Sequence, residues 1–266
     1  MGDLGILGDI LSRTRERVRE RKAALPLDQL LGSGPAALTH RAFGHSISRV
    51  SINVIAEFKR RSPSKGTLRD DLAPDDLAVA YEAGGATALS ILTDADFFGG
   101  SVEDLARARA ATLLPVLRKD FVVDPYQVWE AASLGADAIL LIVAALTDSE
   151  LRSLSEAAAG AGLETLVEVH DREELDRALA VGSLIVGVNN RNLKTMVVDL
   201  QTSLDLVGAI PDHVIAVAES GITTGADVRR LREAGFDAFL VGEHLMRAPD
   251  PGLALRALLL DASKEE

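Results

Sequence analysis

The chain contains no cysteine among its 266 residues, and only 4% of them are aromatic. Without cysteine there is no disulfide framework, no thiol nucleophile and no metal site built on cysteine. The few aromatic side chains leave little material for stacking nucleic-acid bases. No apolar stretch approaches the roughly 20 residues of a membrane span, and no signal-like segment opens the chain. We therefore expect a cytoplasmic protein with no membrane partner.

Basic residues are also in the minority, since 28 Lys and Arg stand against 40 Asp and Glu, for a formal net charge of −12. Proteins that bind nucleic acids in general carry a basic surface, so we expect no nucleic-acid partner. An anionic ligand would have to be held locally. With 47% hydrophobic residues the chain can still bury a large core.

Eight short apolar runs recur with helix-like segments between them. They are VSINVIAEF (50–58), ATALSILTD (86–94), LLPVLRKD (113–120), DAILLIV (137–143), ETLVEVH (164–170), LIVGVNN (184–190), HVIAVAES (213–220) and DAFLVGE (237–243). Their centres lie about 20 to 37 residues apart, the spacing of parallel strands joined by crossover helices. Eight such units predict an α/β protein with a (β/α)8 TIM barrel, and an open doubly wound sheet is the alternative.

Residues 1–266 are expected to form a single barrel domain, of which 1–48 is an N-terminal helical extension. Ile6, Leu7, Ile10, Leu11 and Val18 are spaced to share one helix face, which would pack on the barrel. The basic run RTRERVRERK (13–22) is expected on the solvated face of that helix.

The first apolar run ends in charged residues. Glu57 and Lys59 are two apart and would project from one face of a strand. At a solvated strand end such a pair is ordinary and contributes only about 0 to 1 kcal/mol. In a barrel of this type, however, the active site lies at the carboxyl ends of the strands.

Polar residues recur at those ends: Glu57 and Lys59, Lys119 and Asp120, Glu168, Asn189 to Arg191, Glu219 to Gly221, and Gly242 and Glu243. The centre of the predicted mouth would hold three of these carboxylates and two amines, namely Glu57, Glu168, Glu219, Lys59 and Lys119. Confinement is expected to make a lysine acidic enough to donate a proton near neutral pH. General acid–base chemistry on a polar organic substrate is implied.

Gly221 and Gly242 directly follow the seventh and eighth runs, where backbone N–H groups commonly hold a phosphate, and Ser62 could add a hydroxyl. We expect a small phosphorylated substrate there, and a side chain at Gly242 should raise KM more than it perturbs folding. The five histidines show no metal-ligand spacing. Each is expected to be structural or solvated, and no metal is expected.

Six motifs in order resemble the indole-3-glycerol phosphate synthase family of tryptophan biosynthesis. They are IAEFKRRSPSKG (55–66), LRKDF (117–121), LVEVHD (166–171), GVNNRNL (187–193), VAESGI (217–222) and FLVGEHLMR (239–247). The N-terminal RERVRERKAALPL is also similar to a segment that precedes this family's barrel. The resemblance implies conversion of 1-(2-carboxyphenylamino)-1-deoxyribulose 5-phosphate to indole-3-glycerol phosphate, with loss of carbon dioxide and water and without a cofactor.

The resemblance also implies roles for individual residues. Lys119 matches the general acid toward the substrate carbonyl, Lys59 the lysine that meets the anthranilate carboxylate and shares acid duty, and Glu168 the general base of the later step. Glu57 matches an acid that places the reacting groups. Positions that shape the pocket match Asn189, Arg191, Glu219 and Ser220, and those of its apolar wall match Phe98, Leu140 and Leu193. Some members have a small hydroxyl residue where this chain has Glu243, whose side chain is expected to point to solvent while its backbone faces the phosphate.

Two other functions are alternatives for a barrel of this kind. A phosphoribosylanthranilate isomerase would also be a sugar-phosphate barrel, but the two lysines with Glu57 speak against its chemistry. A catalytically silent barrel that binds a metabolite or a partner subunit would not need Glu57, Lys59, Lys119 and Glu168 together. We expect an active enzyme that is a monomer.

Overall fold

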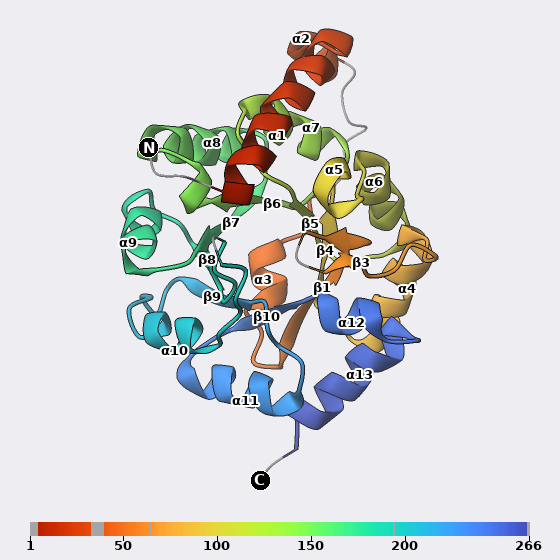
Figure 1. Cartoon of the computed structure of the whole chain (residues 1–266), viewed down its shortest axis with the longest axis vertical. Coiled ribbons are helices and arrows are strands. Elements are labelled where there is room, and N and C mark those ends of the chain that lie inside the picture. Colours follow the sequence, from red (N-terminus) through yellow and green to blue (C-terminus); the bar gives the residue numbers. More distant parts are fainter. Residues whose placement is uncertain (1–4, 33–39, 64, 194, 265–266) are drawn as a thin grey trace.

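The computed structural model describes residues 5–32, 40–63, 65–193 and 195–264. Its centre is a closed barrel of eight parallel strands: β1 (Asn53–Phe58), β4 (Ala88–Leu92), β5 (Val116–Lys119), β6 (Ala138–Ile142), β7 (Glu164–Val169), β8 (Ile185–Asn189), β9 (Ile215–Glu219) and β10 (Ala238–Val241). Sequential strands pair around the ring, and β1 closes it by pairing with both β10 and β4. The prediction of a (β/α)8 barrel, with a strand in each of the eight runs, is confirmed (Figure 1).

Helices surround the barrel, namely α4 (Pro74–Gly84), α5 (Ala95–Phe98), α6 (Val102–Ala111), α7 (Pro125–Ser133), η1 (Val143–Ala145), α8 (Asp148–Gly160), α9 (Arg172–Ala180), α10 (Gln201–Val207), α11 (Gly225–Ala234), α12 (Glu243–Arg247) and α13 (Pro251–Ala262). Many begin at a side chain that accepts a backbone N–H, among them Ser101, Asp124, Thr147, Asp171, Thr224 and Asp250. An antiparallel pair, β2 (Arg61–Ser62) with β3 (Gly66–Thr67), lies in the loop after β1.

Strand alternation divides the core in two. Ile55 belongs to the cluster inside the barrel, whereas Ala56 and Phe58 belong to the cluster under the helices. Glu57 therefore follows Ile55 on the inward face, because side chains two apart share a side of a strand. The bottom of the interior is closed by α3 (Phe43–Ile47), whose two terminal side chains are fully buried.

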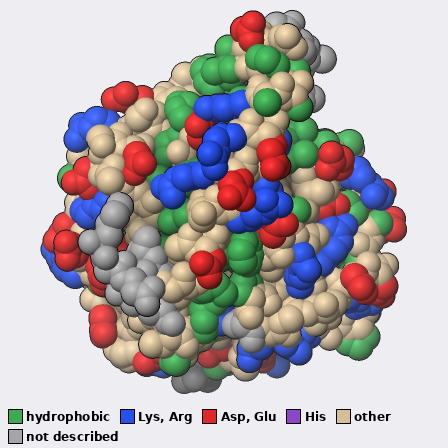
Figure 2. Space-filling model, turned by 45° about the horizontal axis from the view of Figure 1, so that its top comes forward, with side chains coloured by type: hydrophobic (Ala, Val, Ile, Leu, Met, Phe, Trp, Pro, Cys, Tyr) green, Lys and Arg blue, Asp and Glu red, His purple; other side chains and the backbone are tan. Residues whose placement is uncertain are grey.

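The N-terminal extension includes α1 (Gly5–Ala24), α2 (Leu27–Gly32) and α3. Leu7, Ile10, Leu11 and Val18 are buried, which confirms the predicted apolar face of α1. Most side chains of residues 13–22 are exposed, as expected, but Arg17 and Arg21 are partly buried and form ion pairs with Asp94 and Glu130. The exposed Arg13 and Lys22 pair with Asp96 and Asp124. Blue and red side chains accordingly lie interspersed where α1 crosses the molecule (Figure 2). None of the helices in the described ranges is both long and apolar enough to cross a membrane.

Candidate active site

A cavity of about 680 Å³ opens at the carboxyl ends of the strands. This volume is in the usual range for small-molecule sites. All the predicted site residues line it: Glu57, Lys59, Ser62, Phe98, Lys119, Leu140, Glu168, Asn189, Arg191, Leu193, Glu219, Ser220, Gly221, Gly242 and Glu243. The barrel thus brings together side chains that are up to 186 positions apart in the sequence, from 57 to 243.

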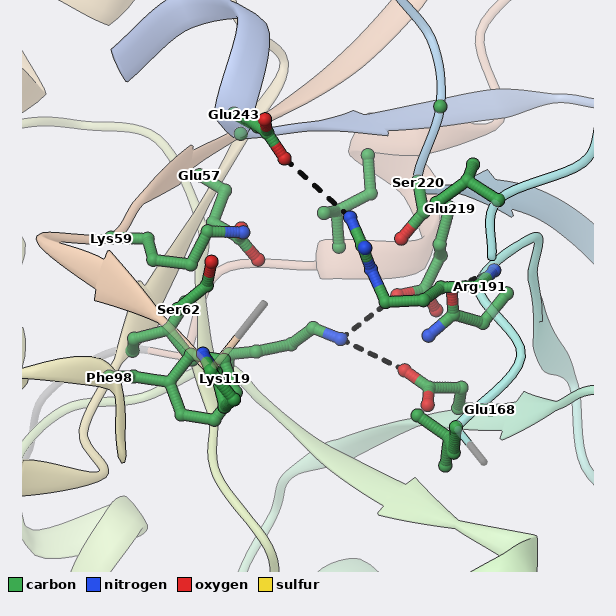
Figure 3. Close-up of a pocket in the computed structure, with 18 of the residues that line it drawn as sticks. Glu57, Lys59, Ser62, Phe98, Lys119, Glu168, Arg191, Glu219, Ser220 and Glu243 are labelled. Atoms are coloured by element: carbon green, nitrogen blue, oxygen red, sulfur yellow. Dashed lines mark hydrogen bonds and ion pairs between the residues drawn. The ribbon is translucent and has the colours of Figure 1, made fainter. Parts of the chain in front are cut away.

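Lys119 lies at the end of β5 and extends across the cavity (Figure 3). Its Nζ donates hydrogen bonds of 2.9 Å to Glu168 Oε2 and 2.9 Å to Glu219 Oε2. Burial alone would lower the pKa of Lys119, but the neighbouring carboxylates outweigh it and raise the pKa above its usual value. The expectation that confinement makes this lysine more acidic was therefore wrong. The two carboxylates that contact Lys119 stabilise its ammonium form more than burial destabilises it.

The backbone on both sides of Lys119 is fixed by Arg118, which is fully buried and does not line the cavity. Its guanidinium donates to Asp120 Oδ2 at 3.0 Å and forms an ion pair with Glu130 at 2.8 Å. It also donates to Thr93 Oγ1 and to the Gln127 carbonyl. Removing one partner from such a buried network typically costs about 3 to 5 kcal/mol. The strand end that carries Lys119 is consequently held rigidly.

Glu57 and Lys59 meet at the end of β1, across the barrel from β7 and Glu168, and Lys59 Nζ donates a 2.6 Å hydrogen bond to Glu57 Oε1. Glu57 is 3% exposed, so the pair is not the solvated one that is common at strand ends. The two lysines thus have separate carboxylate partners.

Glu219 is 1% exposed and has only one paired oxygen among the described residues. Its Oε2 accepts from Lys119, whereas Oε1 lies over Gly187 with no donor. Burial raises the pKa of Glu219 to about 7, although Lys119 opposes the shift. Glu168 shows the opposite behaviour: burial would raise its pKa, but Lys119 and His170 lower it well below the usual value. One carboxyl is therefore held ionised beside another that titrates near neutral pH.

This difference predicts a pH-dependent stability. Between about pH 4.5 and 7 the Glu219 carboxyl ionises in the unfolded chain while the folded chain keeps it protonated, so its contribution to folding is lost as pH rises through this window. We expect Glu219→Gln to gain stability relative to the parent protein between pH 5 and pH 8. Urea unfolding at both pH values measures it, with exposed Glu233→Gln as the control. A Glu219→Gln difference that is the same at both pH values would mean that Glu219 is ionised throughout.

The ends of β8 and β9 are locked together by Asn190, whose importance the sequence did not reveal. Its Nδ2 donates to the carbonyls of Glu219 and Ser220, and its Oδ1 accepts from the Ser203 N–H. Ser220 takes a positive φ of 67°, which is uncommon for a residue with a side chain and is found at functional sites. Asn190 thereby stabilises the turn that carries Ser220 and Gly221.

Ser62, Gly221 and Gly242, the residues expected to bind phosphate, all line the cavity. Ser62 Oγ is buried and has no hydrogen-bond partner among the described residues. The prediction that the Glu243 side chain points to solvent was wrong, because it lies 3.6 Å from Arg191 and 3.2 Å from Arg247 in ion pairs. The first pair spans the mouth of the cavity (Figure 3).

Several lining residues were not predicted, although some lie within the motifs. Lys65, Thr223, His244 and Arg247 add polar groups, and Phe121 and Ile142 extend the apolar wall of Phe98, Leu140 and Leu193. Ile6, Leu7 and Ile10 of α1 also reach the cavity. Their apolar spacing identified a packed face, but nothing in the sequence said that this face also borders the site.

Within the described ranges, no three or more His, Asp or Glu side chains are grouped so that they could hold a metal ion. The glutamate carboxylates around the cavity are instead paired with lysine or arginine.

The sequence matches the indole-3-glycerol phosphate synthase family over residues 7–258. The chain belongs to this family. It is a carboxy-lyase of tryptophan biosynthesis, which closes the indole ring of 1-(2-carboxyphenylamino)-1-deoxy-D-ribulose 5-phosphate with loss of carbon dioxide and water. The product is indole-3-glycerol phosphate.

Solved structures of other barrels are similar in fold alone. N-acetylmannosamine-6-phosphate 2-epimerase from Clostridium perfringens is 18% identical, with a TM-score of 0.60 over 77% of this chain and 93% of that one. Thiamine phosphate pyrophosphorylase from Pyrococcus furiosus is also 18% identical, with a TM-score of 0.60 over 82% of this chain and 99% of that one. The family match, by contrast, includes every predicted site residue.

Proposed function

We propose that Lys119, Glu168 and Glu219 form the acid–base centre of the synthase reaction. The observation that carries this proposal is the position of Lys119 Nζ, 2.9 Å from a carboxylate oxygen on either side. General acids and bases act from hydrogen-bonding distance of the reacting atoms, and these three groups converge on one point of the cavity.

In the ring-closing step, Lys119 donates a proton to the substrate carbonyl oxygen as that oxygen gains negative charge. A lysine paired with two carboxylates is a weak acid, so one of these two ion pairs must weaken before Lys119 can donate its proton. Protonation of Glu219, whose pKa is about 7, leaves Lys119 with one anionic partner and makes its proton easier to give. Glu219 thus tunes the acid.

Lys59 binds the anthranilate carboxylate that leaves as carbon dioxide, and Glu57 holds Lys59 in place. In the dehydration step Lys59 shares the acid role, and Glu168 accepts the proton released as the indole forms. Phe98, Leu140 and Leu193 hold the aromatic ring, while Asn189, Arg191 and Ser220 shape the polar side of the pocket. The phosphate binds Ser62 and the backbone N–H groups near Gly221, Gly242 and Glu243.

The unit that performs this chemistry is proposed to be one barrel domain, 1–266, with its extension 1–48, acting as a cytoplasmic monomer. The test of the overall proposal is indole product formed from the carboxyphenylamino-ribulose phosphate by the purified chain. A protein that binds this substrate without making product would defeat the assignment of an acid–base centre.

Phosphate binding gives a separate prediction. Ser62→Ala should raise KM roughly tenfold and leave kcat within about twofold, because a hydrogen bond to a charged group contributes about 1.5 to 3 kcal/mol and the phosphate does not react. Steady-state kinetics measure the effect, with Ser155→Ala on α8 as a control outside the cavity. An unchanged KM in a folded Ser62→Ala protein would place the phosphate elsewhere.

A further inference from the structure

His170 has no role in the reaction as described above. It follows β7, two positions after Glu168, and its side chain is 12% exposed. Its Nδ1 lies 2.9 Å from Glu174 Oε2, and its Nε2 lies 3.4 Å from Glu168 Oε1. The expectation of a merely structural or solvated histidine does not account for a ring placed between two carboxylates, one of them inside the cavity.

Glu174 is itself fixed in position. It lies in the first turn of α9, where its backbone N–H donates to the capping carboxylate of Asp171. Its Oε2 accepts both the His170 backbone N–H, at 2.8 Å, and the ring Nδ1. The orientation of the imidazole is therefore set by a helix start that does not border the cavity.

The Nδ1 contact has hydrogen-bond geometry, whereas the Nε2 contact with Glu168 is an ion pair without it. A carboxylate next to each ring nitrogen favours the doubly protonated imidazolium. Burial lowers the pKa of His170, but Glu168 and Glu174 outweigh it and raise the pKa to about 10. The other charged groups around this chain of contacts are Lys119 on β5, Glu219 on β9 and Glu57 on β1. Glu168 thus has a cation on each oxygen, Lys119 on Oε2 and His170 on Oε1.

We propose that His170, held by Glu174, is a positioning residue that keeps Glu168 ionised and oriented once Lys119 has given up its proton. This inference rests on the proposed role of Glu168 as base. When Lys119 becomes neutral, Glu168 loses one cation, and burial would then favour its protonated form. Glu219 shows the direction of that effect, since burial and the neighbouring carboxylates raise its pKa to about 7 even with Lys119 beside it. His170 keeps both ring protons throughout. Glu168 therefore stays ionised and can accept a proton from the reaction intermediate.

The test is the pH dependence of kcat for His170→Gln and Glu174→Gln. Both variants remove a charge, and Glu174→Gln keeps an oxygen that can accept the His170 backbone N–H. We expect the acid limb of the profile to move up by at least about one pH unit in His170→Gln, and less in Glu174→Gln, with KM within about threefold. The matched control is Glu173→Gln, which removes a neighbouring exposed charge from the same helix and should leave the profile unchanged.

A folded His170→Gln protein with the parent profile would overturn the inference, as would an equal shift in Glu173→Gln. Should His170→Gln fail to fold, NMR titration of the His170 ring in the parent protein decides: we expect an imidazolium up to about pH 10, and titration near 6.5 overturns the inference. Glu168→Gln, assayed alongside, separates the two proposals. Near-normal kcat in Glu168→Gln would defeat the base itself, whereas lost activity there with an unshifted His170→Gln profile defeats only the role of His170.

Discussion

Replacing Lys119 with methionine should lower kcat by about 10²- to 10⁴-fold while substrate affinity stays within roughly tenfold. This is the usual contribution of a positioned general acid, and methionine keeps the length of the side chain without its proton. The loss of the ammonium also leaves Glu168 and Glu219 facing each other without the cation between them, so one of them will take up a proton. Both the acid and the ionised base are then impaired.

Arginine at this position should not restore the rate, because a guanidinium stays protonated and cannot hand over a proton. Lys119→Arg keeps a cation between the two carboxylates, whereas Lys119→Met does not. Comparing the two variants therefore separates the effect of the positive charge from the effect of proton donation. Single-turnover kinetics of Lys119→Met, Lys119→Arg and Lys59→Met measure the chemical step, with exposed Lys264→Met as the control. Near-normal chemistry in either Lys119 variant would remove it as the acid and give that role to Lys59.

The barrel could be read from the sequence because two signals agreed. Each strand is a short β-branched run, and each is followed by a segment of helical period with a cap or a glycine at its end. Alternation in β1 then predicted that Glu57 and Lys59 share a face, and they meet at 2.6 Å. Which residues end a strand and share one of its faces depends only on the neighbouring sequence, so it could be predicted without knowing the fold.

The protonation state of Lys119 could not be read in the same way. It depends on the carboxylates of Glu168 and Glu219, which are 49 and 100 positions away in the sequence. The sequence predicted that these groups share a mouth, but not that both oxygens lie at hydrogen-bonding distance from one nitrogen. The sign of the pKa shift followed from those distances and was therefore missed.

The sequence also did not show the contacts of His170 or of the arginines in residues 13–22. The partners of His170 are only two and four positions away, at Glu168 and Glu174, but the spacing did not show that the ring lies between them. The arginines of α1 looked solvated because their partners, such as Asp94 and Glu130, belong to loops and helices of the barrel. Charged residues reveal their partners only when the register between distant elements is known.

Alanine at Gly187 or Gly242 should lower kcat by about 10²-fold, because each glycine makes room for a buried carboxylate. A Cβ at Gly187 would lie 2.1 Å from Glu219 Oε1, and a Cβ at Gly242 would lie 2.3 Å from Glu57 Oε1. Neither glycine has a positive φ, and the first group that an added Cβ would meet is the carboxylate. Displacing a catalytic group by about 1 Å can cost this much in rate.

Gly242 was expected from the sequence to admit the phosphate, with KM as the affected constant. Because an added Cβ would also collide with Glu57 and displace it from Lys59, we expect kcat to fall as well. Gly208→Ala is the matched control, because its φ of −64° suits alanine and a Cβ there would meet nothing within 4 Å. Steady-state kinetics with thermal unfolding of all three variants separate rate from stability. If Gly187→Ala and Gly242→Ala keep the kcat of Gly208→Ala, the carboxylates tolerate displacement, and the close fit of glycine to Glu57 and Glu219 has no part in catalysis.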